Sequence, residues 1–373
     1  MKILLIPDSF KGSLSSSRLC AILKKEALAV FPDAEVKAFP MADGGEGTID
    51  AIHAAAGGSF VVLDVVGTCG QPVRARYLSL GETAYVELAE AAGLQHRQPG
   101  FDAANTTTFG VGQLMRHAID AGHRRIVLTL GGSATNDAGC GMAAALGTRF
   151  IAPNGRPFIP TGATLQAVRS IQLNPFFFVK NGIRIEALCD VTNPFSGPQG
   201  AAYVFGPQKG ASPETVKVLD AGLRHIAGIF EKGKGPRLNA MPGAGAAGGC
   251  GGGVAAFLNG RLVSGTETLL DVMRFAEHAK DADLIITGEG LVDGQSAGGK
   301  VISGVAARAA GKPVIVLAGG IAADLAPLYD MGVTAVFPVT PMPQTVSEAM
   351  AGAAKNAAQA ARNLFRFAAA LRR

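Results

Sequence analysis

The chain has 373 residues, of which 48% are hydrophobic and 17% are charged, and its formal net charge is +5. This length suits one large or two ordinary domains, and the high apolar share excludes a disordered, solvated chain. The 50 glycines exceed the usual share of about 7% but have no period of three, which excludes a collagen repeat.

The N-terminal segment predicts the beginning of a parallel sheet. Residues 2–7 are a short apolar run typical of a buried strand, and 13–16 offer N-caps for a helix that ends near residue 29. A second strand over 35–39 and a helix over 48–56 continue the order βαβα. This order is typical of a parallel sheet covered by helices.

The middle of the chain has a different pattern. Apolar runs over 60–66, 73–80 and 83–88, joined by short glycine-containing turns, predict antiparallel strands. Beyond them we expect a helix, three stretches of strand and a second helix, over 106–121, 125–130, 150–160, 184–190 and 212–231. The second helix has Ser212 as its N-cap and Pro213 at its first position.

The C-terminal part returns to alternating strands and helices. We expect three strands and one helix here, over 283–287, 313–318, 333–339 and 299–310. A capping-box pattern formed by Thr345 and Glu348 then begins a last helix that runs to the basic end of the chain.

These elements predict an α/β protein of two domains. A doubly wound parallel-sheet domain is built from both chain ends, residues 1–58 and 281–373. A mixed-sheet α/β domain, residues 59–280, is inserted between them. The segment 105–139, a helix followed by a strand, could belong to either domain.

Six loops that follow predicted strands are rich in Gly, Asp, Ser and Thr. They are 8–13, 42–48, 131–137, 190–194, 288–293 and 319–320. Ligands of open parallel sheets bind at the carboxyl ends of strands, and glycine lets backbone amides approach an anion closely. Any one loop is compatible with an ordinary turn, but together they favour a site for a polyhydroxylated or phosphorylated ligand.

The segment 243–253 contains seven glycines in eleven residues, and Gly243, Gly245 and Gly248 have the spacing of a dinucleotide-binding fingerprint. No strand pattern precedes the segment, so we do not expect a Rossmann site. Two alternatives stay open here: a backbone loop around a nucleotide phosphate, and close packing of a helix against another backbone.

The loops supply carboxylates and lysines and little other chemistry. These are Asp8, Asp43, Glu46, Asp137, Asp190, Glu289 and Asp293, with Lys11, Lys209 and Lys300. Phosphoryl transfer uses such a set, because cations neutralise the phosphates, Mg²⁺ binds a carboxylate and the nucleotide, and an Asp takes the acceptor's proton. The residues alone therefore favour a phosphotransferase with a small acceptor.

Seven motifs, which together span most of the chain, resemble those of the bacterial type I glycerate kinases. They are PDSFKGSLS at 7–15, ADGGEGT at 42–48, GGSATNDAG at 131–139, CDVTNP at 189–194, FGPQKGA at 205–211, GAAGG at 245–249 and TGEG at 287–290. The resemblance implies two α/β domains, one of them flavodoxin-like, with a cleft between them. It further implies ATP and Mg²⁺ as cofactors and D-glycerate as the acceptor.

The family most often phosphorylates the 2-hydroxyl, so the resemblance favours 2-phosphoglycerate over 3-phosphoglycerate as the product. The implied role is to feed glycerate from glyoxylate, glucarate or galactarate breakdown into glycolysis. One departure is visible: Leu291 stands where the family usually has Arg, which puts the role of that guanidinium in doubt.

For such a kinase we expect Asp190 to be the catalytic base, because it ends a predicted strand and lies in the CDVTNP loop. We expect Lys11 to stabilise the transferring phosphate, with Lys209 second in that role. Asp43 and Glu46 are rivals for the base, and the Mg²⁺ ligand stays open among these two and Asp190. The residues expected to bind substrate or nucleotide are Asp8, Ser9, Asp43, Gly44, Gly45, Glu46, Gly47, Thr48, Gly131, Gly132, Ser133, Asn136, Asp137, Asn193, Lys209, Gly245, Gly248, Gly249, Glu289, Asp293 and Lys300.

Other partners are limited by composition. Aromatic residues make up 6%, Trp is absent and basic residues do not cluster beyond 123–125 and 372–373, so we expect no nucleic-acid binding. We find no apolar stretch suited to a bilayer and no signal peptide, and the five scattered cysteines fit reduced thiols, so we expect a cytoplasmic protein. The oligomeric state, a homodimer included, stays open.

Two alternative functions remain at this point. The first is a non-catalytic sensor that binds a small acid without turning over ATP. The second is a kinase for another hydroxy acid or a polyol.

Overall fold

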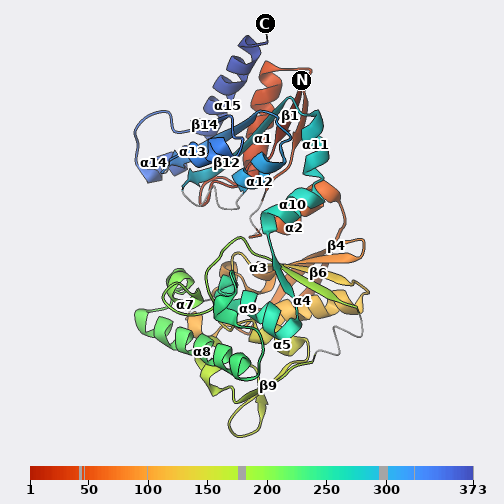
Figure 1. Ribbon diagram of the computed structural model, residues 1–373, viewed down its shortest axis with the longest axis vertical. Coiled ribbons are helices and arrows are strands. Elements are labelled where there is room, and N and C mark those ends of the chain that lie inside the picture. Colours follow the sequence, from red (N-terminus) through yellow and green to blue (C-terminus); the bar gives the residue numbers. More distant parts are fainter. Residues whose placement is uncertain are drawn as a thin grey trace. The chain divides into compact units, whose positions relative to one another are not determined.

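The computed structural model describes residues 1–41, 44–45, 47–98, 100–174, 182–293, 301–322 and 324–372. It divides into two compact units. Unit 1 comprises Met1–Asp43, Asp50–Ala56 and Gly265–Arg373, and unit 2 comprises Gly44–Ile49 and Gly57–Ser264. Both termini therefore belong to unit 1 (Figure 1).

Unit 1 is built on a five-stranded parallel sheet with the order β14-β13-β12-β1-β2. Its strands are β1 (Lys2–Leu5), β2 (Glu35–Ala38), β12 (Leu284–Val292), β13 (Val314–Ile321) and β14 (Ala335–Pro338). Numbered along the chain, this is the 2-1-3-4-5 order of flavodoxin-like sheets. The expected flavodoxin-like parallel sheet, built from both ends of the chain, is confirmed.

Helices from distant parts of the sequence cover this sheet. Helix α1 (Ser16–Val30) and helix α15 (Ala353–Ala370) lie side by side (Figure 1). Together they bury one face of the sheet, where Leu5, Ile286 and Leu317 pack with apolar residues of both helices. Helix α12 (Val301–Arg308) packs on β12. The remaining helices of unit 1 are most of α2 (Thr48–Ala56), α10 (Gly265–Val272), α11 (Phe275–Asp281), α13 (Ala326–Asp330) and α14 (Val346–Ala351).

An ion pair joins the two helices that lie side by side. The Glu26 side chain on α1 is only 5% exposed, and its carboxylate accepts from Arg362 Nε at 2.8 Å and from the second guanidinium nitrogen at 3.1 Å. Hydrogen bonding to Arg362 lowers the pKa of Glu26. The pair therefore stabilises the fold at neutral pH, and this contribution is lost as the pH falls through the lowered pKa.

We expect Glu26→Gln to lower the melting temperature at pH 7 by about 2–4 °C, because Arg362 loses its anionic partner and one of its two acceptor oxygens. The difference in melting temperature between the wild type and the variant should narrow as the pH falls through the lowered pKa of Glu26, because the wild-type carboxylate then becomes protonated. Thermal unfolding from pH 7 downward measures both effects. Glu277→Gln on α11, which removes the charge that pairs with the exposed Arg274, is the matched control and should have almost no effect. A gap that stays constant with pH would contradict the assignment.

Unit 2 contains a six-stranded mixed sheet with the order β11-β10-β6-β5-β4-β3. Strands β5, β6, β10 and β11 are parallel, whereas β3, β4 and β5 are antiparallel neighbours. The bounds are β3 (Ser59–Val66), β4 (Pro72–Leu80), β5 (Thr83–Glu87), β6 (Arg125–Thr129), β10 (Arg184–Leu188) and β11 (Arg261–Val263). The antiparallel pattern predicted for 60–88 and the mixed sheet are thus confirmed.

Within the described ranges, the α-helices of unit 2 are α3 (Leu88–Ala92), α4 (Phe109–Asp120), α5 (Cys140–Ala145), α7 (Ala201–Phe205), α8 (Pro213–Lys232) and α9 (Ala246–Leu258). The predicted start of α8 is confirmed, since Ser212 Oγ accepts from Thr215 N and Pro213 is the first helical residue. A small antiparallel sheet of β7 (Arg149–Ile151), β8 (Pro157–Phe158) and β9 (Ser170–Gln172) completes the unit. In the part of the chain described, no helix combines the length and apolar character needed to cross a bilayer.

Two expected boundaries are wrong. Strands β12 and β13 continue through glycines that the sequence analysis assigned to loops. A Cβ atom on Gly288 would lie 2.3 Å from Leu317 O, and one on Gly319 would lie 2.4 Å from Gly290 O. Glycine therefore permits close approach of the paired strands here and does not end them.

The last helix is also divided. The capping box of Thr345 and Glu348 is confirmed at the start of α14, but Gly352 separates this helix from α15. The helical pattern therefore continues to the basic end of the chain only after a break.

Candidate functional site

In unit 1, predicted site residues lie where the strand order reverses. The chain runs from β1 to β2 in one direction and later adds β12, β13 and β14 on the other side, so the switch point lies between β1 and β12. The Asp8 amide, after β1, donates to Gly288 O on β12 at 2.8 Å. Ser9 and Lys11 follow in the same loop, Glu289 lies on β12 and is 7% exposed, and Asp293 follows that strand. Ligands of such sheets bind at this edge.

The backbone of Lys11 is firmly placed although its side chain is exposed. Phe10 and Leu14 are buried, and the amide of each donates to the carbonyl of the other at 2.8 and 2.9 Å. A Cβ on Gly290 would lie 3.2 Å from Lys11 N, so the loop rests on β12. The ammonium therefore extends from an ordered turn at the switch point.

In unit 2, four parallel strands end at one edge of the sheet. Glu87 ends β5, residues 131–133 follow β6, Asp190 follows β10 and Ser264 follows β11. Asp190 Oδ1 accepts from Ser264 Oγ at 2.8 Å, so the half-buried carboxylate is held by the next strand's end. Asn193 lies further along the same loop, and its amide donates to Gln199 O at 2.9 Å.

The described residues of the 42–48 motif lie along this edge. The Gly131 amide donates to Gly44 O at 3.1 Å, and a Cβ on Gly131 would lie 2.2 Å from Gly45 Cα. Thr48 Oγ1 donates to Gly45 O at 2.7 Å. The structure thus brings Gly44 and Gly45 together with Gly131, which belong to two motifs that are far apart in the sequence.

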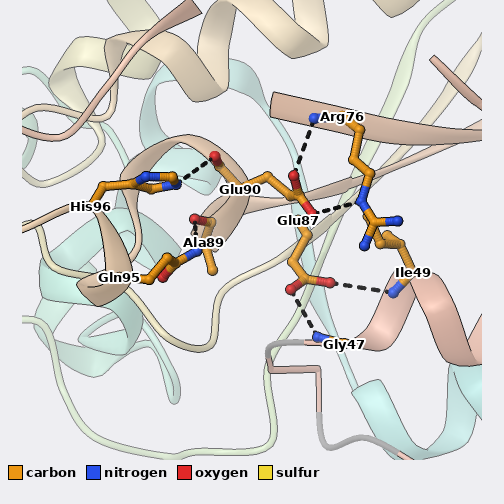
Figure 2. Close-up of polar contacts among 8 residues, drawn as sticks. All are labelled: Gly47, Ile49, Arg76, Glu87, Ala89, Glu90, Gln95 and His96. Carbon is orange, nitrogen blue, oxygen red and sulfur yellow. Dashed lines mark hydrogen bonds and ion pairs between the residues drawn. The ribbon is translucent and has the colours of Figure 1, made fainter. Parts of the chain in front are cut away.

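Glu87 holds the start of α2 and was missed by the sequence analysis. Its carboxylate accepts from Gly47 N at 2.9 Å and from Ile49 N at 3.3 Å, while the neighbouring Glu90 binds the Arg76 amide and Nε (Figure 2). The Glu87 side chain satisfies amides that a helix start leaves unpaired. The one available signal was an acidic residue at the end of an apolar strand.

Asp137 and Asn136, both predicted to bind ligand, are fully buried. Asp137 accepts from the amide and hydroxyl of Thr108 at 2.8 Å, and from Gly139 N and Gly141 N at 3.1 Å. Burial raises the pKa of Asp137, although these hydrogen bonds act to lower it. Its carboxylate therefore joins the start of α4 to the start of α5, which is a structural role.

Lys209 is buried as well, with 2% of its surface exposed. Its ammonium donates to Ser133 Oγ at 2.8 Å and to Thr135 O at 2.7 Å. Lys209 therefore contacts the 131–133 loop directly, through its hydrogen bond to Ser133, and its ammonium does not face solvent.

The glycine-rich segment forms the start of α9 and packs against other backbone. A Cβ on Gly245 would lie 2.2 Å from Pro194 O, and one on Gly248 would lie 2.0 Å from Thr135 O. Gly248 and Gly249 have φ values of 68° and 89°, which favour glycine. Gly245, Gly248 and Gly249 are buried. These contacts support the packing alternative, and a role in nucleotide binding stays a prediction.

Three predicted site residues, Asp43, Glu46 and Lys300, lie outside the described residues. Within the described ranges, no group of three or more His, Cys, Asp or Glu side chains could hold a metal ion. The half-buried Asp190 carboxylate at a strand end fits an ion that uses one protein carboxylate and substrate oxygens, as Mg²⁺ commonly does.

Comparisons with known proteins agree over the full length. Residues 3–369 match the Glycerate kinase family. The chain is 43% identical to a glycerate kinase of Bacillus cereus, which covers 98% of this chain and 97% of the relative. It is 40% identical to a glycerate 2-kinase of Escherichia coli, with 98% and 97% covered. A crystal structure from Salmonella typhimurium LT2, provisionally described as glycerate kinase 2, has a TM-score of 0.83 at 39% identity and covers 100% of this chain and 99% of that one.

Proposed function

Because the chain belongs to the glycerate kinase family, whose members are phosphotransferases with an alcohol acceptor, we propose that it uses ATP with Mg²⁺ and phosphorylates the 2-hydroxyl of D-glycerate. The observation that carries this proposal is the family match over residues 3–369. The name of the Escherichia coli relative, a glycerate 2-kinase, supports the choice of hydroxyl. The expected product is 2-phosphoglycerate.

In each unit, the carboxyl ends of the parallel strands carry groups suited to this reaction. Lys11, on its ordered turn, would stabilise charge on the transferring phosphate. Asp190 would accept the proton of the glycerate hydroxyl, and its bond to Ser264 orients the carboxylate for this step. Bound Mg²⁺ would neutralise phosphate charge, with Asp190, Asp43 or Glu46 as its protein ligand.

The remaining roles concern binding. Asp8, Ser9, Glu289 and Asp293 are proposed to line the switch point of unit 1. In unit 2, the turn after β6 is exposed at Gly132, whose φ of 72° favours glycine, while the Gly131 amide is already bonded to Gly44 O; an exposed glycine turn of this kind suits an anionic oxygen.

The proposed role of the enzyme is to feed glycerate released by glyoxylate, glucarate or galactarate breakdown into glycolysis, in the cytoplasm. A phosphorylated three-carbon acid is the product that such a step delivers. The partners are then small molecules, D-glycerate and ATP.

The test is an assay of the purified protein with MgATP and D-glycerate. We expect ADP release that depends on glycerate, and ³¹P and proton NMR should place the phosphate on C2. Phosphate on C3 would overturn the choice of hydroxyl. Release with tartronate or glycerol but not with glycerate would favour a different acceptor, and glycerate binding without ADP release would favour a sensor.

A further inference from the structure

Lys209 is a buried lysine, and in the described part of the chain its ammonium forms no ion pair. Among the described residues, no carboxylate lies within ion-pair distance of its ammonium, which is bonded to two neutral oxygens, Ser133 Oγ and Thr135 O. Burying a charge in this way is costly, so fully buried lysines are rare unless they are paired. This cost indicates that the lysine has a specific role at this position.

Within the described ranges, three titratable or charged groups lie around Lys209, namely Asp137, Cys250 and Arg97, and none of them forms an ion pair with its ammonium. The Asp137 oxygens accept from Thr108, Gly139 and Gly141. Burial raises the pKa of Cys250 on α9, which keeps that thiol neutral.

The last charged neighbour of Lys209 is Arg97, whose guanidinium donates to Gln208 O and disfavours a second positive charge. Burial is the largest effect and lowers the pKa of Lys209 to about 7, although the Asp137 charge acts in the opposite direction.

The bond to Ser133 determines what that hydroxyl can do. A serine hydroxyl has one hydrogen and two lone pairs. When the ammonium donates to Ser133 Oγ, the hydroxyl accepts one bond and its own hydrogen is left to donate elsewhere. Within the described residues, Lys209 is the one hydrogen-bond partner of Ser133 Oγ. Ser133 also stands next to the exposed Gly132, in the loop that ends β6 at the carboxyl edge.

We propose that Lys209 is a positioning residue, whose ammonium makes Ser133 a hydrogen-bond donor to an anionic oxygen of a bound substrate. The inference rests on the proposed function, because the anion is either the carboxylate of glycerate or a phosphate of the nucleotide. Lys209 itself does not touch the substrate. This differs from direct contact between Lys209 and the transferring phosphate.

The proposal has a consequence for pH. Above about pH 7 the free enzyme loses the Lys209 proton, and the neutral amine then accepts the Ser133 hydrogen. The hydroxyl no longer donates to the anion, so affinity falls as the pH rises. A bound anion in turn favours the protonated amine, because the two protonation states bind the anion unequally.

The experiment measures KM for D-glycerate and KM for the nucleotide between about pH 6.5 and 8.5. Wild-type turnover is measured first, since its absence would overturn the proposed function and not this inference. For one of the two substrates, we expect the wild-type KM to rise about tenfold over the range. The substrate that responds identifies the anion.

Ser133→Ala and Lys209→Met should each raise that KM about tenfold or more at low pH, since a hydrogen bond to a charged group is lost. In both variants the rise with pH should disappear, and the double variant should resemble either single one. Lys217→Met, which removes an exposed charge on α8, is the matched control and should keep the wild-type profile.

Because Lys209→Met could disturb folding, melting temperatures are compared and Ser133→Ala carries the test alone if needed. A wild-type pH profile that persists in Ser133→Ala would overturn the proposal. So would a lower kcat with both KM values and their pH dependence unchanged, which indicates a purely structural role.

Discussion

Lys11→Met is expected to lower kcat/KM at least about a hundredfold, the loss typical when one preorganised donor to a developing negative charge is removed. The reason lies in the turn that carries this lysine. Its neighbours Phe10 and Leu14 are buried and bonded to each other, and Gly290 supports its backbone. The backbone of Lys11 is therefore fixed at the switch point of the unit 1 sheet, while the exposed side chain allows its ammonium to contact a phosphate.

The measurement is steady-state kinetics for both substrates, together with the melting temperature. Because the Lys11 side chain is exposed, Met should leave stability unchanged. Lys24→Met on α1 removes an exposed lysine of the same unit and is the matched control. Lys11→Arg keeps the charge with a different donor geometry and should recover part of the activity. Near-normal kinetics of Lys11→Met would remove this residue from the mechanism.

Local patterns were sufficient to predict the scaffold. Alternating apolar runs predicted β3 to β5, and the N-caps of α8 and α14 stand at Ser212 and Thr345 as expected. These signals lie within a few residues of the elements that they define. The parallel sheet from both chain ends was predictable for a related reason, since its βα units repeat one local order.

Features that depend on distant partners were not predictable. Gly288 and Gly319 resemble turn residues, yet they lie within β12 and β13 because the paired strands approach too closely for a Cβ. The start of α9 has poor helix formers, and its glycines are explained by close packing, as against Thr135 and Pro194, and by the positive φ values of Gly248 and Gly249. Tertiary contact outweighs local propensity in both cases.

The candidate site shows the same division. Composition identified the loops and their carboxylates, but it could not tell a solvent-facing lysine from a buried one. Lys11 and Lys209 occupy similar polar, glycine-containing loops in the sequence, whereas one is exposed and the other is bonded to Ser133 inside unit 2. Glu87 belongs to no motif, because its role arises only when the start of α2 meets the end of β5.

The second large effect is expected at Asp190, where an amide can replace the carboxylate almost without changing shape. Asp190 Oδ1 accepts from Ser264 Oγ at 2.8 Å, and an asparagine oxygen can accept the same bond. Asn cannot take up a proton from the glycerate hydroxyl, however. The substitution therefore removes basicity while the loop after β10 keeps its connection to the end of β11.

Asp190→Asn should consequently lower kcat about a hundredfold or more, the usual contribution of a general base, with little change in melting temperature. Single-turnover and steady-state rates with saturating MgATP and glycerate measure the loss. Asp64→Asn, an exposed change on β3 of the same sheet, should have wild-type kinetics. If Asp190 only holds its turn, the variant should lose less than about tenfold in kcat, a barrier change of under about 1.4 kcal/mol. That result would leave Asp43 or Glu46 as the base, because these two remain the rival carboxylates.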